Sequence, residues 1–226
     1  MTVPDWLQPL ADQVPKVRAE HFTRFVPPPG GGRDSAVLIL FGEGPEGPDV
    51  LLIERAATMR SHAGQPAFPG GAQDPEDDGP VAAALREAEE EVGLRRDTVE
   101  VIGVLPALYL PPSGFVVHPV VAWWREPHEV APMDAAEVAH VVRVPIRDLA
   151  DAENRFRVTH TSGLMGPAFE VKGLVVWGFT AGLLSGLLSL GGWEEPWDQD
   201  RLRELDPETL RLAMKTWERR GRNGNT

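Results

Sequence analysis

The segment GPVAAALREAEEEVGL, which ends at Leu94, constrains the fold more than any other part of the 226-residue sequence. Pro80 suits the first turn of a helix, and Gly93 ends one. At 100° per residue, its apolar side chains gather on one helix face, which can therefore bury against a sheet. These side chains are Val81, Ala84, Leu85, Ala88 and Val92. The segment predicts an amphipathic helix packed on a layer of strands.

Short runs of β-branched and aliphatic residues predict the strands that this helix covers. They lie at 35–42, 49–55, 114–124 and 137–146, with a further run in VEVIGVLPAL. Residues 56–79 are rich in Gly, Pro, Asp and Gln and predict a long loop, and such loops in compact domains are commonly functional. A second helix is expected at 179–190, whereas FEVKGLVVWG is ambiguous by periodicity. Together these elements predict a mixed α/β (α+β) sandwich.

Charge and composition exclude several classes of function. The formal net charge of −12 argues against a protein that binds nucleic acids through a broad basic face. The absence of Cys excludes disulfides, thiolate nucleophiles and Cys-ligated zinc. No segment approaches the roughly 18 consecutive apolar residues expected of a membrane span. The N-terminus also lacks the basic start and apolar run of a secretion signal. We therefore expect a cytoplasmic protein that binds neither membranes nor nucleic acids.

Three carboxylates of the predicted helix are expected to lie together beside its buried face. Glu87, Glu90 and Glu91 fall within about 100° of one another on a helical wheel. Like charges at this spacing repel unless protons or cations compensate. Oxygen ligands favour hard ions such as Mg²⁺, Mn²⁺ or Ca²⁺. The pattern therefore indicates a divalent-metal site, with a solvated acidic face as the alternative because most acidic runs are of that kind.

Residues 86–94, REAEEEVGL, fit the pattern R-E-U-x-E-E-x-G-U, in which U is an aliphatic residue, and they follow a Gly-Gly pair. The segment resembles the Nudix box, G-x5-E-x7-R-E-U-x-E-E-x-G-U, the signature of hydrolases that split nucleoside diphosphates linked to another group. The front half departs from this box. Six residues separate Gly71 from Asp78, and Asp78 stands where the box has Glu.

The preceding stretch LLIERAATMRSHAGQPAFPGG matches L-L-x-x-R-x-x-x-x-R-x-x-x-G-x-x-x-F-P-G-G. It resembles the coenzyme A diphosphatase branch of the Nudix family, although Ile53 stands where that branch usually has Thr. The combined motif covers residues 51–94, and a looser resemblance runs from about residue 35 to 190.

The resemblance implies a Nudix α/β/α sandwich with a central mixed sheet and a bound Mg²⁺ or Mn²⁺. Glu87, Glu90 and Glu91 would coordinate the metal, together with a backbone carbonyl of Gly70 or Gly71. Arg86 would orient one of these glutamates through a charge-assisted hydrogen bond. The reaction would cleave coenzyme A or acyl-CoA into 4′-phosphopantetheine, or its acyl form, and adenosine 3′,5′-bisphosphate.

The base that activates water is expected to be Glu87 or Glu90. Glu129, Asp134 and Glu137 are the alternatives from a later loop, although ordinary surface acids are commoner at such positions.

Four residues before the box are candidates for substrate binding: Arg55, Arg60, His62 and Gln65. The planar fork of Arg suits phosphate, and the 3′-phosphate of coenzyme A is an obvious target. The alternatives are a structural salt bridge for the two arginines and a hydrogen bond within the loop for His62 and Gln65.

The chain is expected to divide into an N-terminal helical segment and linker at 1–34, the Nudix domain at 35–192 and a charged, helical tail at 193–226. A homodimer would be in keeping with many proteins of this kind. The alternatives to coenzyme A hydrolysis are a Nudix hydrolase for another dinucleotide, such as NADH or ADP-ribose, a non-catalytic Nudix binding module, and a calcium-stabilised structural domain.

Overall fold

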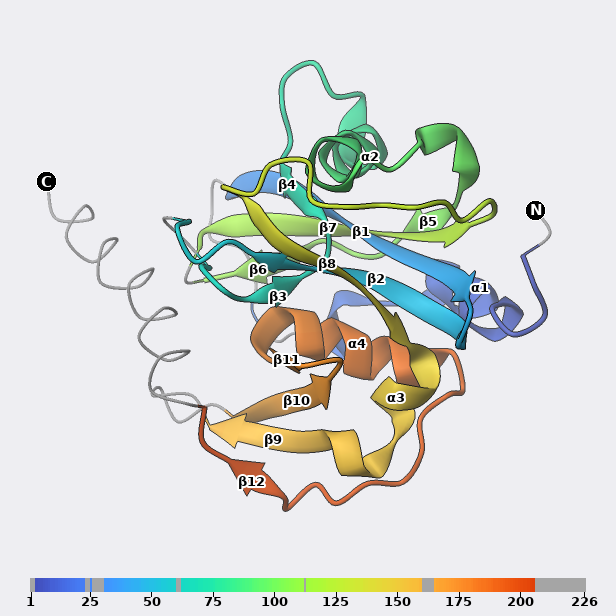
Figure 1. Cartoon of the computed structure of the whole chain (residues 1–226), viewed down its shortest axis with the longest axis vertical. Coiled ribbons are helices and arrows are strands. Elements are labelled where there is room, and N and C mark those ends of the chain that lie inside the picture. The colour runs from blue at the N-terminus through green and yellow to red at the C-terminus, as the bar shows by residue number, and fades with distance from the viewer. Residues whose placement is uncertain are drawn as a thin grey trace, which may run out of the picture.

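The computed structural model describes residues 3–22, 25, 31–59, 62–111, 113–159 and 165–205. An eight-stranded mixed sheet lies at its centre, with the strand order β3-β2-β1-β7-β5 (Figure 1). The other three strands pair with this path, β4 with β1, β6 with β7 and β8 with β2. In this sheet β1 and β7 run parallel, and the remaining pairs are antiparallel. The strands are β1 (Arg33–Gly44), β2 (Gly47–Arg55), β3 (Pro66–Ala67), β4 (Gly70–Ala72), β5 (Val99–Val104), β6 (Leu108–Leu110), β7 (Phe115–Trp124) and β8 (Val138–Pro145).

A second, four-stranded sheet with the order β11-β10-β9-β12 lies on the other side of the molecule from α2 (Figure 1). Its strands are β9 (Arg155–Thr159), β10 (Met165–Val171), β11 (Leu174–Val176) and β12 (Leu202–Arg203). The α-helices are α1 (Gln8–Gln13), α2 (Gly79–Val92), α3 (Ile146–Ala150) and α4 (Gly178–Leu190). The described residues also include the 3₁₀ turns η1 (Val14–Lys16), η2 (Ala19–His21), η3 (Arg96–Thr98) and η4 (Ala152–Asn154).

The alternation of side chains along β1 divides the interior into two layers. Leu38 and Leu40 belong to the cluster under α2, whereas Ile39 and Phe41 belong to the cluster that contains α4. Successive residues of a strand point to opposite faces, so a run that is apolar throughout serves both layers. The sheet is thus covered by α2 on one face and by α1 and α4 on the other, which confirms the predicted mixed α/β sandwich.

The sequence predictions for the main elements are confirmed, and the additional elements are short. Strands at 35–42 and 49–55 form the antiparallel pair β1–β2, and the expected helices are α2 and α4. The ambiguous stretch FEVKGLVVWG is the hairpin β10–β11. Lys172 and Gly173 form its turn with φ of 51° and 78°, as a two-residue hairpin turn requires. The predicted loop at 56–79 also contains β3 and β4.

The two end segments of the described chain pack into the same core layer. Leu7 and Leu10 are completely buried in the cluster that contains α4. The ring of Trp193 lies 6.0 Å from that of Trp6 and 5.6 Å from that of Phe41, measured between centroids. Of the charged, helical tail predicted at 193–226, residues 193–205 contain the short strand β12, and 206–226 lie outside the described residues.

Within the described ranges, none of the helices combines the length and the apolar character needed to cross a membrane.

Replacement of Leu10 by Ala is expected to lower the free energy of unfolding by about 3 kcal/mol, because it leaves a cavity in a fully buried site. Urea denaturation followed by circular dichroism measures this change. Leu202→Ala, at a side chain that is 55% exposed, is the control and should cost less than about 0.5 kcal/mol. Equal effects of the two substitutions would contradict the packing of the N-terminal segment.

Candidate active site

Helix α2 places one carboxylate among its buried apolar side chains. Ala84, Ala88 and Val92 are buried against the sheet as predicted, and Glu91 is buried beside them at 5% exposure. Gly93 ends the helix with a φ of 70°, a conformation that glycine adopts without steric cost. A charged side chain at this depth needs a partner that compensates its loss of hydration.

Strand β4 supplies such a partner through its backbone. It pairs with β1, so that Gly70 lies opposite Val37 and Gly71 opposite Ala36. The Gly70 N–H donates a hydrogen bond of 2.9 Å to Oε2 of Glu91. A Cβ atom on Gly70 would lie 2.3 Å from the Ala36 carbonyl oxygen, and one on Gly71 would lie 2.5 Å from the carboxylate of Glu87. The Gly-Gly pair is therefore needed for close packing of both glutamates.

The guanidinium of Arg86 holds the other acidic groups together. Its Nε and Nη2 donate to the two oxygens of Asp77 at 3.0 and 2.9 Å. Nη1 donates to Oε1 of Glu87 at 2.9 Å and to Oε2 of Glu90 at 3.1 Å. Nη2 also donates to the Ala72 carbonyl at 3.1 Å. This is the hydrogen bond to a box glutamate that the sequence predicted for Arg86, extended to two glutamates.

Asp77 could not be assigned a role from the sequence, because the front half of the motif is longer than the Nudix box. The structure shows that Asp77, rather than Asp78, forms the bidentate pair with Arg86. Asp78 occupies the N-cap of α2 without a side-chain capping bond. The hydrogen bonds from Arg86 lower the pKa of Asp77 below its usual value. The acid that pairs with Arg86 is therefore the residue before the one that matches the Glu of the box.

Burial and like charges act in the opposite direction on the two glutamates beside β4. Burial raises the pKa of Glu91 to about 7, although the Gly70 N–H and Arg55 favour the charged form. Repulsion from Glu87 and Glu137 raises it further. Burial also raises the pKa of Glu87, against the attraction of Arg86. Both sites therefore favour the addition of positive charge.

The oxygen donors of α2 suit a hard divalent cation, although their side chains point in different directions. Among the described residues, no three His, Asp or Glu side chains lie close enough to hold a metal ion. Glu87 and Glu91 turn toward β4, whereas the Glu90 side chain is 59% exposed on the other side of Arg86. Arg86 binds one oxygen of each of Glu87 and Glu90. Burial disfavours the ionised form of the two carboxylates beside β4, and a bound cation would stabilise that ionised form.

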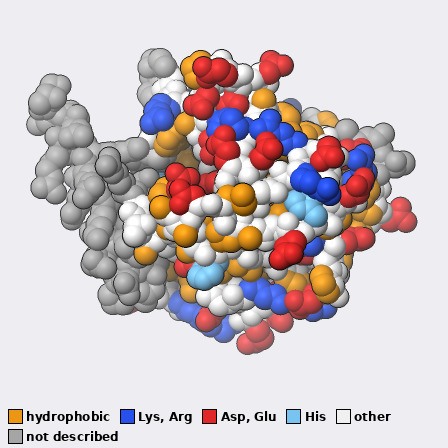
Figure 2. All heavy atoms as spheres, turned by 45° about the horizontal axis from the view of Figure 1, so that its top comes forward, with side chains coloured by type: hydrophobic (Ala, Val, Ile, Leu, Met, Phe, Trp, Pro, Cys, Tyr) orange, Lys and Arg blue, Asp and Glu red, His pale blue; other side chains and the backbone are white. Residues whose placement is uncertain are grey.

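Glu89 points away from this cluster. It is 52% exposed and forms an ion pair with Arg96. Acidic and basic side chains are interspersed over this face of the molecule (Figure 2).

The candidate substrate-binding residues lie at the β2–β3 connection. Arg55 ends β2, and its Nη1 lies 3.5 Å from Oε1 of Glu91. The Arg55 Nε is buried and has no hydrogen-bond partner. His62 Nδ1 and Gln65 Oε1 are 3.0 Å apart, which is the hydrogen bond within the loop that was the alternative interpretation. Arg60 lies outside the described residues.

The three alternative bases lie in or next to the connection between β7 and β8, and they differ in position. Glu137 is close enough to Glu91 to raise its pKa, and the Glu137 carbonyl accepts a hydrogen bond of 2.8 Å from the Ala56 N–H. Asp134 accepts a hydrogen bond from the Ala136 N–H and so stabilises its own loop. Glu129 is exposed. Glu137 is therefore placed so that its charge acts on the Glu91 carboxylate.

Residues 32–161 match the family profile of the NUDIX domain, and the chain belongs to this family. A relative named "Uncharacterized Nudix hydrolase NudL" from Cronobacter sakazakii is 41% identical, over 69% of this chain and 81% of its own length. A protein of the same name from Escherichia coli (strain SMS-3-5) is 39% identical over the same shares. The crystal structure of the Nudix hydrolase RenU from M. smegmatis has 22% identity and a TM-score of 0.53, and the match covers 81% of this chain and 98% of RenU.

The chain is accordingly a Nudix hydrolase with the mixed-sheet fold of that family. Nudix hydrolases act on nucleotide substrates of small size and generally need a divalent cation such as Mg²⁺ or Mn²⁺. The oxygen-rich cluster on α2 agrees with this requirement.

Without metal, the stability of the protein should fall as the pH rises from about 4.5 to about 7. Glu91 binds its proton more tightly in the folded state, because its pKa is about 7 there against an ordinary value of 4.5. Over this interval the unfolded chain releases the proton and the folded chain retains it, so ionisation favours unfolding. Glu91→Gln cannot ionise and should lose less stability.

Thermal unfolding at pH 5 and pH 8 in the presence of a chelator tests this prediction. Mn²⁺ at pH 8 should restore the melting temperature of the native protein more than that of Glu91→Gln. The same pH response in both proteins would show that Glu91 is already ionised at pH 5.

Arg86→Lys should weaken Mn²⁺ binding by about 10- to 100-fold, because a single ammonium cannot replace the fork that holds Asp77, Glu87 and Glu90. Isothermal titration calorimetry measures the affinity. Arg96→Lys, whose ion pair with Glu89 lies outside the cluster, is the matched control and should bind Mn²⁺ as the native protein does. Unchanged affinity in Arg86→Lys would remove Arg86 from the positioning of the ligands.

Proposed function

We propose that the protein hydrolyses the diphosphate bond of coenzyme A or acyl-CoA. The products are 4′-phosphopantetheine, or its acyl form, and adenosine 3′,5′-bisphosphate. The observation that carries the proposal is the placement of the segment 51–71. Its first arginine, Arg55, ends beside Glu91, and its Gly-Gly pair contacts Glu87 and Glu91. The segment that resembles coenzyme A diphosphatases is therefore built into the acidic cluster.

Glu87, Glu90 and Glu91 would hold Mg²⁺ or Mn²⁺, with the backbone carbonyl of Gly71 as a further ligand. A bound divalent cation supplies charge that screens the diphosphate oxygens and makes water a better nucleophile. Arg86 contributes by fixing Glu87 and Glu90 relative to Asp77 before the substrate arrives. Such fixed ligands need little rearrangement when charge develops during the reaction.

The proton of the attacking water is assigned to Glu87 or Glu90, as the motif implies. Glu87 is partly buried, and burial raises its pKa, which makes its carboxylate a better proton acceptor. Glu137, in the turn before β8, is the alternative, since its charge acts on Glu91. Substitution of each acid by its amide separates the candidates through the pH profile of the rate.

The substrate phosphates would be bound by Arg55, Arg60, His62 and Gln65. The buried Nε–H of Arg55 has no hydrogen-bond acceptor, and the contact between Arg55 Nη1 and Glu91 is long at 3.5 Å. An anion that bound Arg55 would thus replace a weak contact. His62 adopts a φ of 55°, which is uncommon outside glycine and is frequent at functional loops.

A Nudix hydrolase of another dinucleotide, such as NADH or ADP-ribose, is the second candidate. Two differences motivate it: Ile53 replaces the usual Thr of the coenzyme A branch, and the front half of the box is one residue longer. Ile53 is completely buried in the cluster under α2 and lies opposite Ala67. A residue at this position packs the core and does not reach the substrate. The difference therefore bears more on stability than on specificity.

Coenzyme A incubated with the protein and Mg²⁺ or Mn²⁺ at slightly alkaline pH should yield adenosine 3′,5′-bisphosphate, detected by chromatography. A chelator should stop its release, and Glu90→Gln should slow it by orders of magnitude without loss of the fold. A faster rate with NADH or ADP-ribose than with coenzyme A would favour the second candidate. No turnover of any of these substrates would favour a non-catalytic binding module.

The remaining expectations, a cytoplasmic location and a homodimer, stay predictions.

A further inference from the structure

The side chain of Arg55 is held much more weakly than that of Arg86, although both arginines touch the acidic cluster. Five hydrogen bonds of 2.9 to 3.1 Å fix the Arg86 guanidinium. The Arg55 guanidinium contacts Oε1 of Glu91 through Nη1 at 3.5 Å, and its buried Nε–H has no acceptor. That contact is longer than the roughly 2.7–3.2 Å of an ordinary N–H···O hydrogen bond. Arg55 therefore keeps donors available for another partner.

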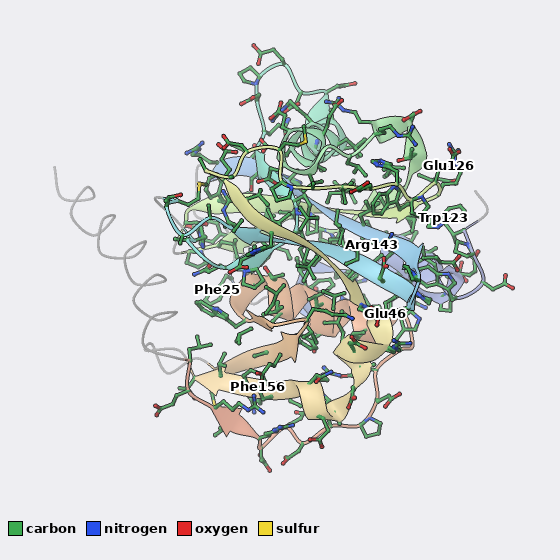
Figure 3. The ribbon with its side chains drawn as sticks, in the orientation of Figure 1. Phe25, Glu46, Trp123, Glu126, Arg143 and Phe156 are labelled. Atoms are coloured by element: carbon green, nitrogen blue, oxygen red, sulfur yellow. The ribbon has the colours of Figure 1, made fainter. Side chains whose placement is uncertain are left out.

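The backbone of Arg55 is fixed on both sides, so its side chain can move alone. Strand β2 runs from the turn that contains Glu46, labelled in Figure 3, to Arg55 at its opposite end. There the Arg55 N–H donates to the Gln65 carbonyl at 3.1 Å, and the Arg55 carbonyl accepts from the Gly64 N–H at 2.9 Å. On its other side Arg55 pairs with Val138 of β8. Its side chain is 20% exposed, so the guanidinium can reach a ligand from solvent without movement of the strand.

The two oxygens of Glu91 are bound unequally. Oε2 accepts the hydrogen bond of 2.9 Å from the Gly70 N–H, whereas Oε1 has the long contact with Arg55. The Gly70 N–H thus holds the carboxylate in place when Arg55 leaves. Within the described ranges, Arg55 forms an ion pair with Glu91 and with no other acid. A loss of negative charge at Glu91 therefore removes the attraction that keeps Arg55 in its present position.

Arg55 and a divalent cation both depend on the charge of Glu91. Two positive groups that share one carboxylate repel each other, so each weakens the hold of the carboxylate on the other. The anionic oxygens of a phosphate offer Arg55 a stronger partner, because the planar guanidinium binds them through two parallel hydrogen bonds. The buried Nε–H, which has no acceptor, is one of the donors that such a pair uses.

We propose that Arg55 is the counter-ion of Glu91 in the metal-free protein and exchanges it for a substrate phosphate when a divalent cation is bound at Glu91. This role of Arg55 rests on the proposed function in one respect, that the substrate carries phosphate groups at a site that holds a cation. Arg55 thereby couples the two ligands, and each binds more tightly when the other is present. The metal-free protein binds phosphate groups weakly and so does not sequester its substrate.

Inorganic pyrophosphate tests this role without metal, since coenzyme A, NADH and ADP-ribose all contain its diphosphate group. Isothermal titration calorimetry with a chelator at pH 8, above the pKa of Glu91 of about 7, measures the affinity. Glu91→Gln removes the charge that holds Arg55 and should bind pyrophosphate about tenfold more tightly than the native protein. Glu89→Gln removes the same charge from the exposed face of α2 and is the control, which should bind as the native protein does.

The same substitution in an Arg55→Gln background separates release of Arg55 from a general loss of negative charge. With no guanidinium to release, Glu91→Gln should change the affinity for pyrophosphate by less than about twofold. An equal gain with and without Arg55 would show that repulsion by Glu91 alone controls binding, and it would overturn the proposal. So would the absence of a gain in Glu91→Gln.

Chemical modification of the native protein serves if a variant fails to fold. Phenylglyoxal modifies accessible guanidinium groups, and peptide mapping by mass spectrometry gives the rate at each arginine. Arg55 should react several-fold faster with Mg²⁺ than with a chelator, and pyrophosphate added with Mg²⁺ should slow the reaction again. Arg96, which pairs with Glu89 outside the cluster, is the internal reference and should react at one rate throughout.

Equal rates at Arg55 with and without Mg²⁺ would overturn the proposal. None of these measurements depends on hydrolysis, so absence of coenzyme A turnover would contradict the proposed function alone.

Discussion

The burial of Glu91 is the constraint on which the rest of the site depends. A carboxylate inside the α2–sheet interface is costly unless its oxygens are bonded. The Gly70 N–H and Arg55 meet this need only in part, and the pKa of Glu91 remains raised. The position of β4 follows, because its Gly-Gly pair must approach both α2 and β1 without side chains between them. The stability lost by burying this charge leaves a site ready to accept a cation.

The sequence predicted those parts of the site that depend on the local pattern of residues within α2. The period of α2 identified its buried face, and the glutamates and Arg86 lie where a helical wheel places them. The spacing before the helix was less informative, since Asp78 stands where the box has Glu, whereas Asp77 forms the ion pair with Arg86. A loop can absorb an extra residue without moving its ends, so counting along the chain does not identify the acid. The conformation of the folded backbone determines which carboxylate contacts the guanidinium.

The contacts between distant segments could not be predicted from the sequence. Glu137 and Arg55 act on Glu91 because β8 pairs with β2, and no local pattern encodes that pairing. The second sheet was also missed, and its strands β9 and β12 are short. A short strand has too few residues to show a clear alternation of apolar and polar side chains. The main sheet has longer runs, which explains why β1, β2 and β7 were recognised.

The contact between Trp6 and Trp193 has a consequence for the synthesis of the chain. The layer that holds α1 and α4 is completed by residues from both ends of the described sequence. During translation, Leu7 and Leu10 are synthesised first. Their side chains stay exposed to water until α4 and Trp193 have been synthesised and can cover them. Domains generally fold as units, and apolar surface exposed in the interval promotes aggregation. The α2 layer, whose contributing segments end at β8, can assemble on the ribosome well before the layer beneath it.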